Sequence, residues 1–77
     1  MNRARRKRIE DVQSQVEALK QEIDSILSEE QEALDNMPES LQEGERGQAM
    51  QEAIDALESA VSSFEEIDEY LTDAHDH

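Results

Sequence analysis

The spacing of apolar residues constrains the fold of this 77-residue chain more than any other feature of the sequence. In each half, apolar residues recur in alternating steps of three and four, with no glycine or proline between them. Such steps place apolar side chains on one side of an α-helix at every turn, so the sequence predicts an all-α fold. The apolar seam consists of Ile9, Val12, Val16, Leu19, Ile23, Ile26, Leu27, Leu34, Met50, Ile54, Leu57, Val61, Phe64, Ile67 and Leu71.

The two halves are separated by a segment that holds the only proline, Pro38, and both glycines, Gly44 and Gly47. The residue before a proline is pushed out of the α region, and glycine adopts backbone angles that other residues resist. We therefore expect a corner with a short helical turn, in which Leu41 closes the end of the core. The residues of this corner are Asn36, Pro38, Leu41, Gly44, Arg46 and Gly47.

A chain of this length forms one domain at most. The expected segments are a basic flexible arm over 1–8, a first helix over 9–36, the corner over 37–47, a second helix over 48–74 and a frayed tail over 75–77. An antiparallel, coiled-coil-like hairpin whose paired residue numbers sum to about 84 brings Leu34 to Met50 and Leu27 to Leu57.

The apolar stripe is wider than one partner helix covers, because Ile26 lies beside Leu27, and Ile67 lies near Tyr70 and Leu71. We therefore predict a homodimer in which two hairpins form a four-helix bundle. A helix from another protein is the alternative partner. Glu30 and Asp68 interrupt the stripe and are expected near an end or edge of the bundle or against a cation, since a buried carboxylate without a partner is costly.

Charge is distributed unevenly along the chain. The net charge is −14, from 7 Lys and Arg against 21 Asp and Glu. From residue 9 onward only 2 cations, Lys20 and Arg46, oppose all 21 acids, which leaves −19. Such a surface repels nucleic acid, so nucleic acid is not the expected partner. The remaining five cations form a candidate contact arm of Arg3, Arg5, Arg6, Lys7 and Arg8.

The charge pattern leaves two alternative functions open. The acidic body is typical of a nucleic-acid mimic that inhibits a host DNA-binding enzyme by occupying its cationic groove. A weaker alternative is nucleic-acid binding through the basic arm, since clustered cations neutralise phosphates. We expect the arm instead to be solvated or to pair with Asp73 and Asp76 of the tail, and Arg46 to pair with a carboxylate of the corner.

The sequence offers little material for catalysis or for a cofactor. It has no cysteine, its two histidines, His75 and His77, lie at the end of the chain, and it has no glycine-rich phosphate loop. Neither histidine follows a glutamate by three residues, as a di-iron carboxylate bundle requires. We expect no enzyme activity, no metal and no cofactor. No apolar run is long enough for a membrane span, so a soluble, cytoplasmic protein is expected.

The corner and the second helix carry a recognisable combination of short motifs. An "N-x-P-E-S-L-Q" corner, formed by Asn36 and residues 38–42, precedes "E-R-G" at residues 45–47 and a helix of "EAID-LE" type. Over residues 29–71 the chain resembles short acidic helical proteins encoded by phages and mobile elements of gram-positive bacteria. That family has no assigned biochemical role, so the resemblance implies an origin and not an activity. The expected function is that of a small non-catalytic interaction or regulatory protein that self-associates.

Overall fold

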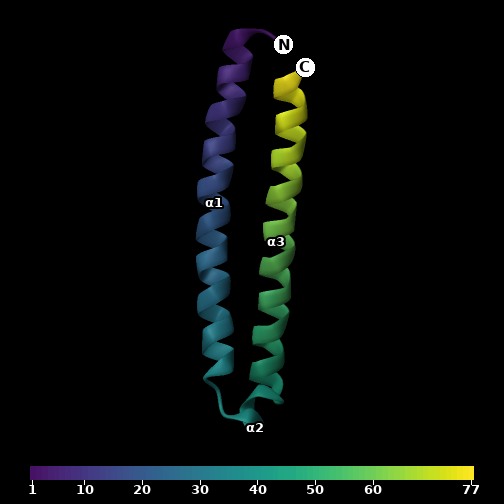
Figure 1. Cartoon of the computed structure of the whole chain (residues 1–77). Helices are drawn as coiled ribbons and strands as arrows, with labels where there is room; N and C mark the ends of the chain where they lie inside the picture. Colours follow the sequence, from purple (N-terminus) through teal and green to yellow (C-terminus); the bar gives the residue numbers. More distant parts are fainter.

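The protein is a long, extended pair of helices in the computed structural model, which describes residues 1–77. The elements are α1 (Arg3–Asp35), α2 (Glu39–Gln42) and α3 (Glu45–Asp76), and no strand is present. Figure 1 shows α1 and α3 side by side, with the short α2 at one end and both chain termini at the other. The molecule measures 58 × 15 × 12 Å, so it is a rod rather than a sphere.

Helix α1 begins at Arg3, six residues before the start that we expected at Ile9. The cause is the side chain of Asn2, whose oxygen accepts a hydrogen bond of 2.8 Å from the backbone N–H of Arg5. This cap satisfies one of the free donors in the first turn of the helix. The basic residues 3–8 therefore form the first turns of α1, although their positive charge is unfavourable for the helix dipole.

The corner is held by hydrogen bonds to backbone carbonyl groups. The Gln42 side chain donates to the carbonyl of Met37 at 2.9 Å, and the backbone N–H groups of Leu41 and Gln42 both donate to the carbonyl of Pro38. Gly47 is buried, and a Cβ at this position would lie only 2.6 Å from the Cα of Gln42. Gly47 therefore allows the backbones of α2 and α3 to approach closely.

The expectation that Leu41 closes the end of the core is wrong, because 54% of this residue is exposed. Helix α2 contacts α3 through the backbone of Gln42, and the preceding residue, Leu41, points about 100° away around the helix. Leu41 is thereby turned toward solvent. Leu34, which is 8% exposed, and Ile54, which is fully buried, form the core above the corner.

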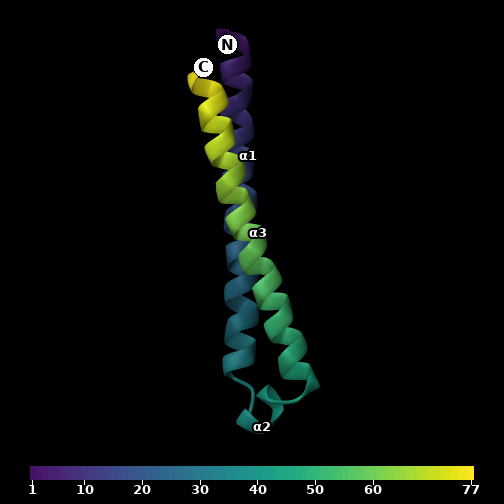
Figure 2. The same ribbon diagram turned by 90° about the vertical axis from the view of Figure 1, so that its right-hand side faces the viewer.

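Polar contacts between α1 and α3 report how the two helices are aligned. Gln13 Nε2 donates to Thr72 Oγ1 at 3.1 Å, Lys20 Nζ lies 3.4 Å from Glu65 Oε1, and Glu10 Oε2 lies 2.8 Å from His75 Nε2. In each pair the residue numbers sum to 85, one residue from the alignment that we expected. The two helices run in opposite directions and are inclined to each other, as Figure 2 shows.

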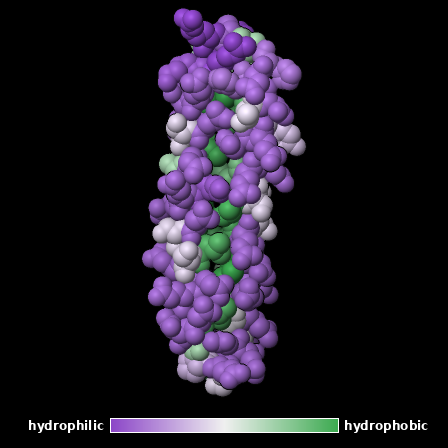
Figure 3. Space-filling view, in the orientation of Figure 1, coloured by the Kyte–Doolittle hydropathy of each residue, from purple (hydrophilic) through white to green (hydrophobic).

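The interior of the helix pair is thin. Only Leu34, Gly47 and Ile54 are buried, and most of the seam is half-buried between the two helices. Figure 3 shows a line of apolar patches along the middle of the rod, interrupted and flanked by hydrophilic side chains. Each half-buried side chain stabilises the fold by only part of the roughly 1.5–3 kcal/mol that full burial gives.

Candidate interaction surface

The seam between α1 and α3 has two edges, and one of them is polar. The three cross-helix contacts, from Glu10, Gln13 and Lys20 to α3, all lie along this edge. We call it the polar edge. On α3 it is marked by Glu58, Glu65 and Thr72, which are spaced seven residues apart and so lie above one another on the helix.

The opposite edge of the seam is apolar. Val12 lies about 100° around α1 from Gln13 and about 200° from Glu10, and Ile67 lies about 200° around α3 from Glu65. Because the polar edges of the two helices face each other, their apolar rows lie together on the other side of the rod. We call this surface the open apolar face. It comprises Val12, Leu19 and Ile26 of α1 and Ala53, Ala60 and Ile67 of α3.

The large side chains of the open apolar face remain substantially exposed. Leu19 is 56% exposed, and Val12, Ile26 and Ile67 are between 40% and 44% exposed. Tyr70, one turn beyond Ile67 on α3, is 73% exposed. Val12, Leu19 and Ile26 lie seven residues apart on α1, and Tyr70 lies about one turn from Ile67 on α3. The exposure therefore follows a row along the rod rather than a scatter of single residues.

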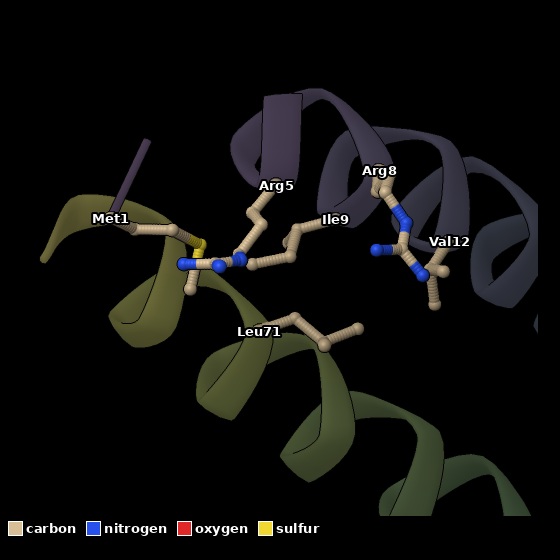
Figure 4. Close-up of a pocket in the computed structure, with 6 residues that line it drawn as sticks. All are labelled: Met1, Arg5, Arg8, Ile9, Val12 and Leu71. Carbon is tan, nitrogen blue, oxygen red and sulfur yellow. The ribbon is translucent and has the colours of Figure 1, made fainter. Parts of the chain in front are cut away.

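Two cavities open along this face. The first, of about 290 Å³, is lined by Arg5, Arg8, Ile9, Val12, Leu71 and Met1. Figure 4 shows the side chains of Ile9 and Leu71 between those of Arg5 and Arg8, with Val12 beside Arg8. The second cavity, of about 200 Å³, is lined by Ala60, Ser63, Phe64 and Ile67. Both have an apolar lining, which suits side chains of a partner.

The polar edge has a different character. A cavity of about 290 Å³ on this side is lined by Val16, Glu17, Lys20, Phe64, Glu65, Asp68 and Glu69. Asp68, which interrupts the seam, is exposed here and accepts a hydrogen bond of 3.4 Å from Gln13. Glu30 is half-buried farther along α1. No group of three or more His, Cys, Asp or Glu side chains in the structure is placed to hold a metal ion.

His75 joins the ends of the two long helices. Its Nε2 lies 2.8 Å from Glu10 Oε2, and its Nδ1 lies 3.4 Å from Asp76 Oδ1. The hydrogen bond to the Glu10 carboxylate, and then that to Asp76, raise the pKa of His75 above its ordinary value of 6.5, because both favour the charged ring. The carbonyl oxygen of His75 accepts a further hydrogen bond of 3.0 Å from Arg6 Nε.

The basic arm contacts the tail through carbonyl groups and not through the two acids that we expected. Arg6 binds the carbonyl of His75, and the amino group of Met1 lies 2.7 Å from the carbonyl oxygen of His77. Asp73 makes no ion pair, and Asp76 pairs only with His75. The expected pairing of Arg46 with a corner carboxylate is likewise missing. The histidine carbonyls prevail because α1 begins at Arg3 and so lies alongside the last turn of α3.

Three cations of the arm remain free for an external contact. Lys7 pairs with Asp11 at 3.3 Å and Arg6 binds the tail, whereas Arg3, Arg5 and Arg8 have no acidic partner within the chain. Two of these three, Arg5 and Arg8, line the larger apolar cavity. The sequence identified the arm but did not predict that Arg5 and Arg8 lie beside an apolar cavity. This arrangement depends on α1 continuing through residues 3–8 as a helix.

None of the three helices contains an apolar stretch of the length needed to cross a bilayer. Comparison of the chain with protein families, with curated proteins and with solved structures finds no match.

Proposed function

We propose that this protein acts as a non-catalytic protein-interaction module that self-associates, with two antiparallel hairpins packing into a four-helix bundle through the open apolar face. The observation that carries the proposal is the row of Val12, Leu19 and Ile26, which the fold leaves between 40% and 56% exposed. On an isolated helix pair this row stays in water, whereas a second copy would cover it.

Helix geometry supports a bundle over other assemblies. In a four-helix bundle each helix uses one edge of its apolar stripe for one neighbour and the other edge for a second neighbour. Helix α1 contacts α3 through Val16, Ile23 and Leu27, which are half-buried. The adjacent row of Val12, Leu19 and Ile26 then has the position that a second neighbour requires. Helix α3 has the same arrangement, with Ile67 exposed next to the half-buried Phe64 and Leu71.

Sedimentation velocity over a dilution series tests this proposal. We expect a dimer at micromolar concentration that dissociates on dilution, together with a loss of helicity, because the thin core of one copy is then exposed. Leu19→Ser should raise the dimer dissociation constant by at least about tenfold, since two apolar side chains are removed from each dimer interface.

The matched control is Ala18→Ser, which changes the neighbouring exposed residue on the outer side of α1. It should leave the dissociation constant within about twofold of the original, since Ala18 lies outside the open apolar face. A wild-type protein that stays monomeric and fully helical across the series would contradict the proposal.

A second candidate function rests on the polar edge. Glu17, Glu65, Asp68 and Glu69 gather around one cavity in which Lys20 is the only cation. We propose, as the alternative, that this surface occupies the cationic groove of a DNA-binding enzyme. Binding to such an enzyme should weaken steeply with added salt. Neutralising the helix α3 acids by Glu65→Gln, Glu66→Gln and Glu69→Gln should abolish it, whereas Leu19→Ser should leave it in place.

A further inference from the structure

We infer that the two copies lie antiparallel, with a two-fold axis at the level of Leu19 and Ile67, so that the basic end of each rod covers the acidic half of the other. This inference rests on the proposed self-association and specifies its geometry. Helix α1 of one copy then packs against α1 of the second copy, and α3 against α3. The competing geometry keeps the rods parallel and places α1 over α3 of the second copy.

The level of the axis follows from the contact between Lys20 and Glu65, which lie 3.4 Å apart across the helix pair. Leu19 and Ile67 are neighbours of these two residues, so they occupy nearly the same height on the rod and share the open apolar face. Leu19 is also the midpoint of α1, which covers Arg3–Asp35. An axis at this height therefore makes the two α1 helices overlap along their whole length.

The exposed apolar row of α1 is complementary to the same row of the second copy under this two-fold symmetry. Val12 and Ile26 each lie seven residues from Leu19, in opposite directions along α1. A two-fold axis at Leu19 thus places Leu19 against Leu19 of the second copy and Val12 against Ile26 of the second copy. In an isologous interface each contact occurs twice, so all three exposed side chains of α1 are covered.

Charge decides between the antiparallel and the parallel geometry. Arg8 lies one turn before Val12, and Glu29 lies one turn after Ile26, on the same outer edge of α1. Neither has an oppositely charged partner within its own chain. The antiparallel geometry brings Arg8 to Glu29 of the second copy at both ends of the interface. The parallel geometry instead leaves Arg8 and Glu29 of the two copies far apart along the bundle, so this complementary pairing is lost.

The two cavities of the open apolar face are also filled. The larger one, lined by apolar side chains together with Arg5 and Arg8, matches an apolar side chain followed by a carboxylate, which is what Ile26 and Glu29 of the second copy provide. The smaller one, beside Ser63 and Ile67, lies opposite Tyr70 of the second copy. This contact accounts for a tyrosine that is 73% exposed in one copy alone.

Distances between spin labels test the geometry directly. The chain has no cysteine, so Ala4→Cys and Ala18→Cys each give one labelled site per copy, and both residues are exposed on the outer side of α1. Ala4 lies fifteen residues from the axis, so at about 1.5 Å per residue its two labels should be separated by about 45 Å along the rod. The Ala18 labels should be separated by little more than the width of the bundle.

Equal distances at the two sites would overturn the antiparallel geometry while leaving self-association intact. No intermolecular signal at either site, at a concentration where the helices are folded, would overturn the proposed self-association as well. The two failures are therefore distinguishable within one experiment.

Charge reversal provides the second test. Arg8→Glu alone, or Glu29→Arg alone, should raise the dimer dissociation constant about tenfold, because two ion pairs per dimer become repulsive contacts. The double variant should restore the original constant to within about twofold. The matched control reverses the charges of Arg3 and Glu32, which lie off the open apolar face. Neither single reversal nor the double variant should change the dimer dissociation constant by more than about twofold. Failure of the double variant to rescue would contradict the Arg8–Glu29 contact.

Discussion

Gly47 shows how a single residue decides the geometry of the corner. Its backbone angle is ordinary, since no glycine of the chain has a positive φ, so the requirement for glycine is one of space. A methyl group at this position would overlap the backbone of Gln42, with a separation of 2.5 Å from its carbonyl carbon. Backbone cannot move aside as the end of a flexible side chain can. The corner must therefore open when this glycine is replaced.

Gly47→Ala should lower the free energy of unfolding by about 1–3 kcal/mol, the usual cost of forcing extra volume into a packed site. Urea unfolding at one fixed protein concentration would measure the loss. Gly44→Ala is the matched control, because a Cβ there meets only the Leu41 carbonyl oxygen at an ordinary 3.5 Å. Its effect should stay below about 1 kcal/mol. Equal losses in the two variants would contradict the close approach at Gly47.

The side-chain contacts of His75 make the stability of the folded protein depend on pH. Its pKa is raised in the folded protein by Glu10 and Asp76, so the folded state binds a proton more tightly than the unfolded chain does. The stability from this contact is fully present below the unfolded value of about 6.5, and it is lost as the pH rises through the raised pKa.

Thermal unfolding followed by circular dichroism should therefore show a melting temperature that falls as the pH is raised from about 6 to about 8. His75→Gln should reduce this fall, since the group that titrates is removed. His77→Gln is the control, because no side-chain contact of His77 is present, and it should behave like the original protein. A fall of the same size in the His75 variant would assign the effect to other groups.

At the scale of elements, the N-terminal end of α1 is stabilised by Asn2, the residue that precedes the helix. Cations occupy five of its first six positions, and no acidic residue lies in its first turn to offset the dipole. The Asn2 cap compensates by accepting the Arg5 N–H. The cap lies at the start of the helical turns that carry Arg5 and Arg8, two of the residues that line the larger cavity.

Asn2→Ala should cost about 1 kcal/mol of helix stability, concentrated in the first two turns of α1. Amide hydrogen exchange of residues 5–9 would detect it as faster exchange, with little change near Ile23. Asn2→Asp is the control, since an aspartate keeps the capping oxygen and adds a negative charge near the N-terminus of the helix. Unchanged exchange in the alanine variant would contradict the capping role.

At the scale of the whole molecule, shape is the dominant property. The Cα radius of gyration is 17.4 Å, whereas a compact domain of this length has a value of about 11 Å. A single rod therefore has much surface and little interior, and sideways association is the way to build a thicker core. End-to-end association would cover none of the open apolar face.

Small-angle scattering at a concentration that favours the dimer should show a doubled mass with little increase in the longest dimension, which is 58 Å for the Cα positions of one copy. The cross-section should grow instead, because the second rod lies alongside the first. The Leu19→Ser variant, measured at a concentration where it is monomeric, provides the reference curve. A longest dimension close to twice that of the reference would contradict sideways packing.

The sequence by itself determined the helices and the place of the corner. Alternating steps of three and four from Ile9 to Ile26 and from Met50 to Phe64 admit only a helical period, and Pro38 prevents the first helix from continuing. The cross-helix contact of Lys20 with Glu65 lies one residue from the alignment read off those steps. These features are local, or they follow from matching two local patterns.

Only the tertiary structure decided which part of each apolar stripe is covered. Ile54 is fully buried and Ile67 is 43% exposed, although both belong to the same stripe of α3. The stripe is wider than one neighbouring helix, so the rotation of each helix about its own axis selects the edge that faces the partner. That rotation is fixed by contacts between residues distant in the sequence, such as His75 with Glu10 and Lys20 with Glu65. Leu41 was misplaced for the same reason, since the packing of α2 on α3 turned it outward.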